Sequence, residues 1–400
     1  MNGKKGRFSA RKLKVSLISL LLGTALLVTG CGTKNVSAPT ADKDKQPIKI
    51  GAVIDISGPG ASLGVPERDS IELWEEQVNK NGGINGRPVD VIILDNESDE
   101  TKSVLAFKKL VNEENVVAVA GASQSGTSIA MINSATQAQI PLVSAAASKK
   151  IIDPIGERKW IFKTAQNDSV VADKAIEYLK AKKLTKIAFL SMNNAFGDSG
   201  LVEFAALAKN AGIEIVVQEK FGATDVDFTP QLTAVKSKKP QAMVVWAIPP
   251  SAALITKQAR ELGINTPILH SHGIANKAFI DLAGPAANGV VFPAGKLLVA
   301  EKLPDSDPQK AALLTYIKDY EKADRPRSAF GGHGYDAVTL IGKAIQAVGT
   351  DPAKIREALE KTDIAGVSGI FKMTQADHSG ISKESLVMIV IKDGKWELTE

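Results

Sequence analysis

Hydrophobic and polar positions along the chain alternate between short β-rich runs and longer amphipathic stretches. The run Ile48–Ile54 predicts a strand, and the stretch 66–79 after it predicts a helix with Ile71, Trp74 and Val78 on one stripe. Asn, Gly and Gly at 81–83 end this helix. The same unit recurs, with strands predicted at 89–94, 116–120 and 141–143 and helices at 101–114 and 125–138.

A second series of the same kind follows. Its strands are predicted at 187–190, 213–217, 243–246 and 268–270, and its helices at 169–181, 199–211, 230–237 and 251–262. Strands that alternate with helices form parallel sheets with helices on both faces. The two series therefore predict an α/β protein with two doubly wound parallel-sheet lobes. Residues 385–398 depart from the pattern and predict a terminal β-hairpin with its turn at 392–395.

The N-terminus has the pattern of an export signal. Its apolar run, Val15–Val28, is shorter than a membrane span and follows the basic residues Lys4, Lys5, Arg7, Arg11, Lys12 and Lys14. We expect residues 1–30 to be a signal peptide; the alternative is an N-terminal core or anchor helix. Cys31 is the one cysteine and follows Thr29-Gly30 directly.

The surroundings of Cys31 resemble the lipobox of bacterial lipoproteins, in which the cysteine receives lipid and becomes the new N-terminus. This resemblance implies lipidation at Cys31 and a membrane-anchored protein that does not span the bilayer. Residues 31–46 are polar and contain Pro39, which predicts a flexible tether between the lipid and the folded domain.

Composition sets limits on size and partners. A chain of 400 residues with 44% hydrophobic residues suits two domains with sizeable cores. The formal net charge is +5, and it becomes −1 once the six positive charges of residues 1–30 are removed. A nearly neutral mature protein has no electrostatic basis for binding nucleic acid.

Two loops with small and hydroxyl-bearing residues follow the predicted strands 116–120 and 141–143. They are 121–128, Gly-Ala-Ser-Gln-Ser-Gly-Thr-Ser, and 144–148, Ser-Ala-Ala-Ala-Ser. Open parallel sheets bind ligands at the carboxyl ends of their strands, and the start of a helix favours an anion. The loops therefore predict a pocket for one carboxylate. The alternative is that these serines only cap helices.

Motifs for nucleotides, metals and catalysis are missing from the sequence. The glycines at 58, 60 and 64 do not have the spacing of a dinucleotide loop, and no phosphate-binding G-x-x-x-x-G-K-[ST] occurs. The four histidines do not form a zinc motif, and no nucleophile elbow is present. We therefore expect neither an enzyme nor a cofactor or metal site.

The chain resembles the leucine/isoleucine/valine-binding protein family, which has the type I periplasmic-binding fold. The pieces that carry the resemblance extend over Ile48–Leu398 and are Ser57-Gly58-Pro59, 81–86, 121–128, 145–148, Phe196-Gly197 and 258–260. The family implies an extracytoplasmic solute-binding lipoprotein of an ABC importer, acting as a monomer with ABC permease subunits on the cell membrane.

The same resemblance implies three crossovers between the lobes, which we place near 165, 292 and 368. Lobe 1 would then consist of 47–165 and 293–368, and lobe 2 of 166–292 and 369–400. Hinge closure would trap the ligand between them.

The resemblance also assigns site residues. Ser125 and Ser148 match hydroxyls that hold the ligand carboxylate, and Ala146 matches a carbonyl that receives an ammonium in amino-acid binders. Phe330 and Leu63 match apolar contacts on lobe 1. Phe196 matches an aromatic wall on lobe 2, where Trp246 or Ile248 and His272 would close the far side.

His272 departs from the family pattern, because amino-acid binders have an acid at this position that pairs with the ammonium. A histidine suits an acceptor or a second anionic group on the ligand instead. Residues 62–68 and 163–168 also look like a subgroup associated with aromatic carboxylates. We therefore expect a small carboxylate without an α-amine, an aromatic or 2-oxo acid. The alternatives are a branched-chain amino acid, with Asp198 or another acid serving the ammonium, and a ligand-sensing receptor subunit.

Overall fold

The computed structural model describes residues 46–399. The predicted export signal, the tether up to residue 45 and the predicted lipidation site Cys31 lie outside the described residues. Within the described part, none of the helices is both long and apolar enough to cross a bilayer.

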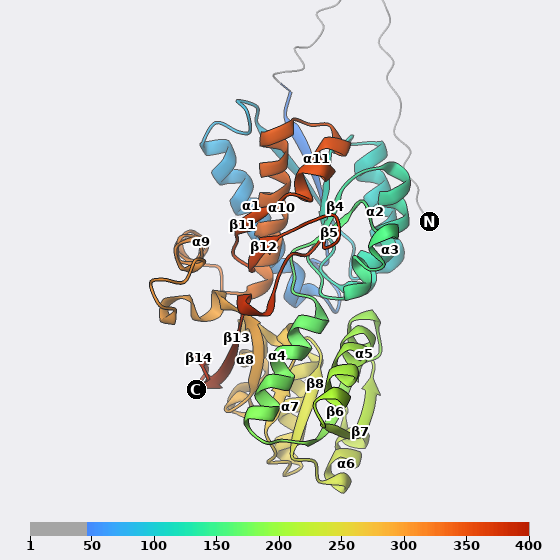
Figure 1. The fold of residues 1–400 in the computed structure, drawn as a ribbon, viewed down its shortest axis with the longest axis vertical. Coiled ribbons are helices and arrows are strands. Elements are labelled where there is room, and N and C mark those ends of the chain that lie inside the picture. The colour runs from blue at the N-terminus through green and yellow to red at the C-terminus, as the bar shows by residue number, and fades with distance from the viewer. Residues whose placement is uncertain (1–45, 400) are drawn as a thin grey trace, which may run out of the picture. The chain divides into compact units, whose positions relative to one another are not determined.

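The first sheet has five parallel strands in the order β2-β1-β3-β4-β5. It belongs to the upper lobe in Figure 1, where β4 and β5 are labelled. Alternation of side chains along β1 explains why it is buried on both faces: Ile50 and Ile54 belong to one apolar cluster and Val53 to another. The strands are β1 (Ile48–Ile54), β2 (Val89–Asp95), β3 (Val119–Gly121), β4 (Leu142–Ser144) and β5 (Ile161–Lys163).

Helices cover both faces of this sheet. Side chains of α1 (Ala61–Lys80), α10 (Ala329–Val348) and α11 (Pro352–Leu359) fill the cluster on one face. Those of α2 (Glu100–Asn112) and α3 (Ser125–Ala138) fill the cluster on the other. The carboxyl ends of β3 and β4 are left open, and these are the ends that position the site.

The second sheet has seven strands in the order β14-β13-β10-β9-β8-β6-β7. Its parallel strands are β6 (Lys186–Met192), β7 (Glu214–Phe221), β8 (Ala242–Trp246), β9 (Ile268–His270) and β10 (Val291–Gly295). The predicted terminal hairpin is confirmed as β13 (Leu386–Lys392) and β14 (Lys395–Leu398), and it joins the sheet antiparallel to β10.

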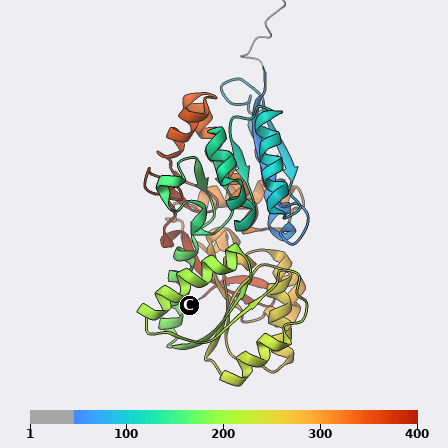
Figure 2. The same cartoon turned by 90° about the vertical axis from the view of Figure 1, so that its right-hand side faces the viewer.

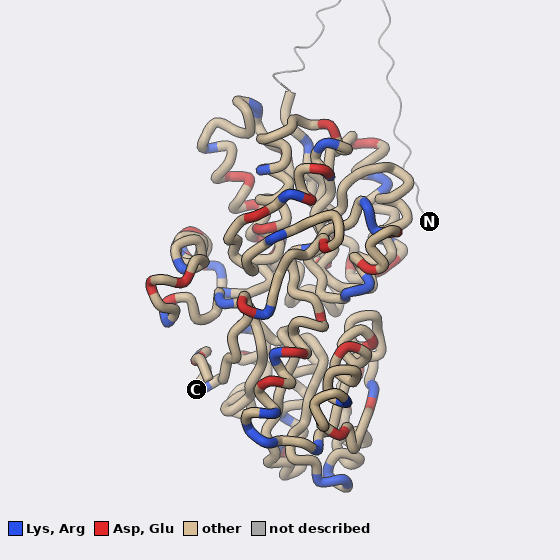
Figure 3. The backbone as a smooth tube through the Cα atoms, viewed as in Figure 1, with Lys and Arg blue, Asp and Glu red and all other residues tan. Residues whose placement is uncertain are grey.

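Helices flank this sheet on both sides (Figure 2). They are α4 (Asp168–Ala181), α5 (Ala195–Asn210), α6 (Thr229–Lys238), α7 (Ser251–Glu261) and α8 (Lys277–Ala283). A further helix, α9 (Lys310–Lys322), packs in a small cluster of its own, and 3₁₀ turns lie at 149–151, 155–157, 272–274, 284–287, 296–302 and 383–385. Basic and acidic residues are interspersed over both lobes (Figure 3).

The structure confirms the predicted α/β class with two parallel-sheet lobes and corrects one crossover. The chain leaves the first sheet after β5 and leaves the second after β10. The third passage was placed near 368, but Phe371, Met373 and Ile381 are buried in the cluster of the first sheet. It therefore lies after Ile381, just before β13.

Candidate ligand-binding site between the lobes

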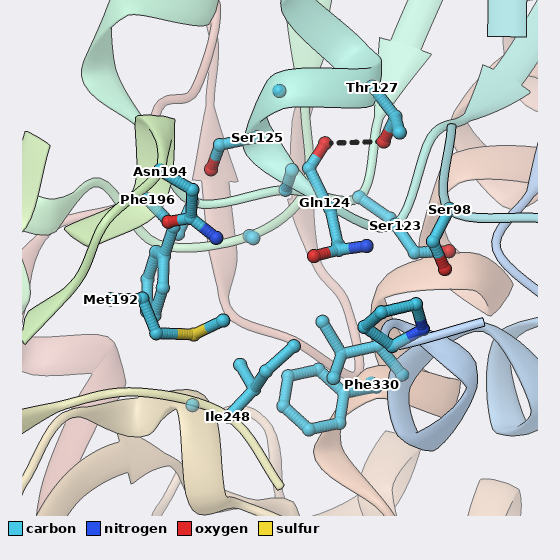
Figure 4. A pocket seen from close by; sticks show the side chains of 18 of the residues that line it. Ser98, Ser123, Gln124, Ser125, Thr127, Met192, Asn194, Phe196, Ile248 and Phe330 are labelled. Carbon is cyan, nitrogen blue, oxygen red and sulfur yellow. Dashed lines mark hydrogen bonds between the residues drawn. The ribbon is translucent and has the colours of Figure 1, made fainter. Parts of the chain in front are cut away.

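A cavity of about 190 Å³ lies between the two lobes. Residues 123–127 and 145–147, which follow β3 and β4, form its first-lobe wall together with Leu63 and Phe330 (Figure 4). Met192, Asn194, Phe196, Ile248 and His272 form the wall on the second lobe. The cavity therefore lies where open parallel sheets bind ligands, at the carboxyl ends of their strands.

The structure brings most of the predicted site residues together. The cavity is lined by Leu63, Ser125, Ala146, Phe196, Ile248, His272 and Phe330. Ser148 and Trp246 are buried behind the wall and do not line it. Ser123, Gln124 and Thr127 also line the cavity, as the predicted loop 121–128 implied. Sequence reasoning missed four lining residues with polar side chains: Ser98, Glu100, Asn194 and His333.

The hydroxyl of Ser148 has a local structural role. Its Oγ accepts a hydrogen bond from Lys150 N (3.3 Å) and so caps the short 3₁₀ turn 149–151. Its backbone N–H donates to Ser125 Oγ (3.2 Å). For Ser148 the capping alternative is therefore the one that the structure supports, and of these two serines only Ser125 lines the cavity.

Asp55, at the end of β1, holds the loop 122–127 in place. Its carboxylate is completely buried and accepts hydrogen bonds from Gln124 Nε2 (2.7 Å), Asn96 Nδ2 (2.8 Å), Ser123 N (3.2 Å) and Thr127 Oγ1 (3.3 Å). Burial raises the pKa of Asp55, and these donors oppose the rise. The aspartate thus fixes the side chain of Gln124, which points into the cavity (Figure 4).

The start of α3 faces this cavity. The first hydrogen bond of its turn runs from Ser128 N to Gln124 O (3.0 Å), so the N–H groups of residues 125–127 precede it. Such N–H groups have no partner inside the helix, and the helix dipole adds positive potential there. With the Ser125 hydroxyl beside them, they can hold the two oxygens of a carboxylate.

The second-lobe wall is aromatic and rigid. The Phe196 ring lies 5.7 Å from the His272 ring, edge to face, and 6.0 Å from the Trp246 ring behind it. Gly200 of α5 leaves room for Trp246, because a Cβ there would lie 2.2 Å from the indole. Trp246 therefore supports the wall from behind and fixes the position of Phe196.

Two buried histidines line the cavity. His272 comes from the second lobe and His333 from α10. Burial lowers the pKa of each to about 3, so both rings are neutral at pH 7. Neither Nδ1 has a hydrogen-bond partner within the described residues. Neutral imidazoles can donate to or accept from a ligand.

An acid lines the cavity, and a buried lysine lies behind its wall. Glu100 is the acidic side chain among the described lining residues, and it is exposed to solvent. Lys163 ends β5, is fully buried, and donates from Nζ to the carbonyl oxygen of Ala147. The resemblance noted for residues 163–168 did not indicate that Lys163 is buried.

A family model described as "Periplasmic binding protein" matches residues 47–395. The chain belongs to the periplasmic binding protein family. This confirms the resemblance found in the sequence, together with the lobed fold that it implied. Proteins of this family bind solutes outside the cytoplasm, in agreement with a cavity lined by small, polar and apolar side chains.

Relatives of this binding protein include the leucine-, isoleucine-, valine-, threonine- and alanine-binding protein of Pseudomonas aeruginosa, 27% identical over 84% of this chain and 87% of that protein. An extracellular ligand-binding receptor from Rhodopseudomonas palustris HaA2 superposes with a TM-score of 0.83 at 30% identity, covering 88% of this chain and 99% of that chain. A Streptococcus pneumoniae branched-chain amino acid transporter substrate-binding protein, in complex with isoleucine, superposes with a TM-score of 0.79 at 28% identity over 88% and 99% of the two chains.

Proposed function

We propose that this protein is the extracytoplasmic solute-binding component of an ABC importer and captures a small carboxylate between its lobes. The observation that carries the proposal is the cavity itself. One lobe presents the N–H groups at the start of α3 and the Ser125 hydroxyl, and the other presents an apolar and aromatic wall. A ligand that touches both lobes stabilises the closed state by its differential affinity.

The ligand class that the relatives favour is the branched-chain amino acids, so we place it first. Support comes from the names of the curated relatives and from the solved complex with isoleucine. Leu63, Met192, Phe196, Ile248 and Phe330 offer an apolar surface for an aliphatic side chain. The aromatic or 2-oxo acid that the sequence favoured has less support from the relatives.

A carboxylate without an amine remains a second candidate because of one specific observation. The residue at 272 is a buried neutral histidine, and Glu100, the acid among the described lining residues, is exposed. A buried ammonium needs a counter-charge or several acceptors to offset its lost hydration.

The surrounding predictions belong to the same proposal. Export of residues 1–30, lipidation at Cys31, a tether to 46, a monomeric state and docking of the closed form on permease subunits would place the protein at the outer face of the cell membrane. The lobes would be 47–165 with 293–381, and 166–292 with 382–400, after correction of the third crossover.

Thermal unfolding of the chain from Gln46 onward, measured against a ligand panel, tests the proposal. The panel contains Leu, Ile and Val, with benzoate, phenylglyoxylate and aliphatic 2-oxo acids beside them. A ligand at 100 times its dissociation constant stabilises by about 2.7 kcal/mol and should raise the midpoint by several degrees. We expect a shift with the branched-chain amino acids.

Ser125→Ala should reduce that shift, whereas Ser134→Ala, further along the same helix, should leave it unchanged. A shift with the amine-free acids alone would replace the first ligand class by the second. No shift with any carboxylate would contradict the proposed function.

A further inference from the structure

Lys163 is a fully buried lysine without an ion-pair partner in the part of the chain that the structure describes. Its Nζ donates to Ala147 O and lies 3.4 Å from Ser148 O. Asp168 is completely buried as well, and its charge favours the ammonium form of Lys163 without forming an ion pair with it. A buried ammonium that is held only by carbonyl oxygens is costly, so its presence calls for a further anion.

The hydrogen bonds around Lys163 lead to the cavity. The Ala147 carbonyl accepts from Lys163 Nζ, and the N–H of the same peptide unit, that of Ser148, donates to Ser125 Oγ (3.2 Å). The C=O and N–H of a trans peptide point in opposite directions, so one peptide plane connects the ammonium to the serine. Because Ser125 Oγ accepts this bond, its own hydrogen is free to donate into the cavity.

We propose that Lys163 provides the counter-charge for the ligand carboxylate, acting through the Ala147–Ser148 peptide and the Ser125 hydroxyl. The inference rests on the proposed function and deepens it, because it makes the carboxylate the group that the site requires. Chains of hydrogen bonds polarise one another, so the positive charge strengthens the Ser125 donor. Lys163 is a positioning residue that does not itself line the cavity.

Binding of a carboxylate should then be coupled to protonation. Burial lowers the pKa of Lys163 to about 7, and the nearby charges of Asp168 and Asp377 oppose this decrease. The other titratable groups that face it are His272 and His333, whose pKa of about 3 keeps them neutral near pH 7. A bound carboxylate favours the ammonium form, so the protein should take up about half a proton at pH 7.

Calorimetric titrations in buffers of different ionisation enthalpy measure this uptake. The probes are L-leucine and benzoate, with leucinamide and benzamide as matched compounds without a carboxylate. The uptake by the wild type should grow from pH 6 to pH 8, because more Lys163 is deprotonated in the free protein as the pH rises. Uptake that decreases from pH 7 to pH 8 would point to Asp168, whose pKa burial raises to about 6 in the free protein, and would overturn the proposal.

Lys163→Met removes the charge and keeps the length of the side chain. We expect at least a tenfold loss of affinity for the carboxylate probe, loss of the preference for carboxylate over amide, and loss of proton uptake. Thermal unfolding of the free variant is measured as well, because the buried Asp168 loses the nearby positive charge of Lys163. Lys150→Met, an exposed lysine near the same loop, is the control and should change none of these values.

The possible outcomes separate the two proposals. If carboxylates bind the wild type and Lys163→Met equally, with the same selectivity, Lys163 is only structural and the solute-binding function stands. If no carboxylate binds the wild type, the proposed function fails and the role of Lys163 fails with it. If Lys163→Met does not fold, the pH profile of proton uptake by the wild type decides alone.

Discussion

Buried ionisable side chains lie around the cavity, and they differ in the groups that hydrogen-bond to them. Asp55 accepts hydrogen bonds from four donors, Lys163 donates to carbonyl oxygens, and Glu67 has the hydroxyl of Ser123 beside its carboxylate. Glu67 lies on α1, completely buried against Gly334 of α10. Such a group is best accommodated in its neutral, protonated form.

Glu67→Gln should flatten the dependence of stability on pH. Burial raises the pKa of Glu67 well above its usual value of 4.5, and the charge of Asp55 raises it further. The folded state thus holds the proton more tightly than the unfolded state. Its contribution is complete below pH 4.5 and is lost as the pH rises through the folded-state pKa, by up to about 1.4 kcal/mol per pH unit.

Urea unfolding at pH 5 and pH 8 measures this loss. The difference should be smaller for Glu67→Gln than for the wild type. Glu76→Gln, an exposed acid on the same helix, serves as the control and should behave as the wild type does. Equal differences in all three proteins would show that Glu67 ionises freely in the fold.

The sequence predicted which loops form the site, but it could not predict which of their side chains point into the cavity. Ser125 and Ser148 both follow strands, and chain order alone places them near each other. Which hydroxyl faces the cavity depends on the peptide planes of residues 145–148, which no local pattern specifies. Lys163 and His333 escaped notice because their importance comes only from burial by distant parts of the chain.

At the scale of elements, strand–helix alternation predicted most of the elements up to His270, but it predicted none of the helices between 271 and 384. The longest of these, α10, has a glycine-rich start that hid it. Residues 329–334 of α10 contain Gly331, Gly332 and Gly334, which have low helix propensity. A Cβ at Gly334 would lie 2.8 Å from the backbone of Glu67. Close packing of α10 on α1 therefore overrides the low helix propensity of these glycines. The sequence alone could not show this packing.

A similar close contact supports the aromatic wall, so Gly200→Ala should disturb both stability and binding. The added methyl would meet the Trp246 indole at 2.2 Å and displace it, and Phe196 packs against this indole. Overpacking of this kind costs about 1–3 kcal/mol. Chemical denaturation and ligand titration of the variant measure the two effects.

Gly156→Ala is the matched control, because a Cβ there has no neighbour within 4 Å. We expect little change in stability or affinity for this variant. If Gly200→Ala also changed neither stability nor affinity, the surroundings of Trp246 would be able to adjust to the added methyl. Trp246 would then not be what fixes the aromatic wall.

At the scale of the molecule, the lobes meet along one side of the cleft. Asn276 of the second lobe donates from Nδ2 to Ser62 O on α1 (3.0 Å), while its Oδ1 caps α8 by accepting from Phe279 N (3.1 Å). Ala329 N donates to Ala275 O beside it (2.9 Å). These bonds join segments from the two lobes and so favour the state in which the lobes are together.

Asn276→Asp should therefore weaken ligand binding while leaving the helix cap intact. The variant keeps the Oδ1 acceptor and loses the Nδ2 donor, and a hydrogen bond contributes about 1 kcal/mol, which corresponds to roughly a fivefold loss of affinity. Small-angle scattering should also show less compaction with ligand. Asn210→Asp introduces the same charge at an exposed position of α5, and affinity should not change there.

The order of segments in the two sheets has a consequence for how the chain is made. The first core needs α10, which begins at Ala329, and the second sheet needs β13, which begins at Leu386. Neither lobe can complete its core until nearly the whole chain is available, and contacts between such distant segments form slowly. With export of residues 1–30 as proposed, such a slowly folding chain would still be open when it reached a narrow translocation channel, and its two cores would form on the far side.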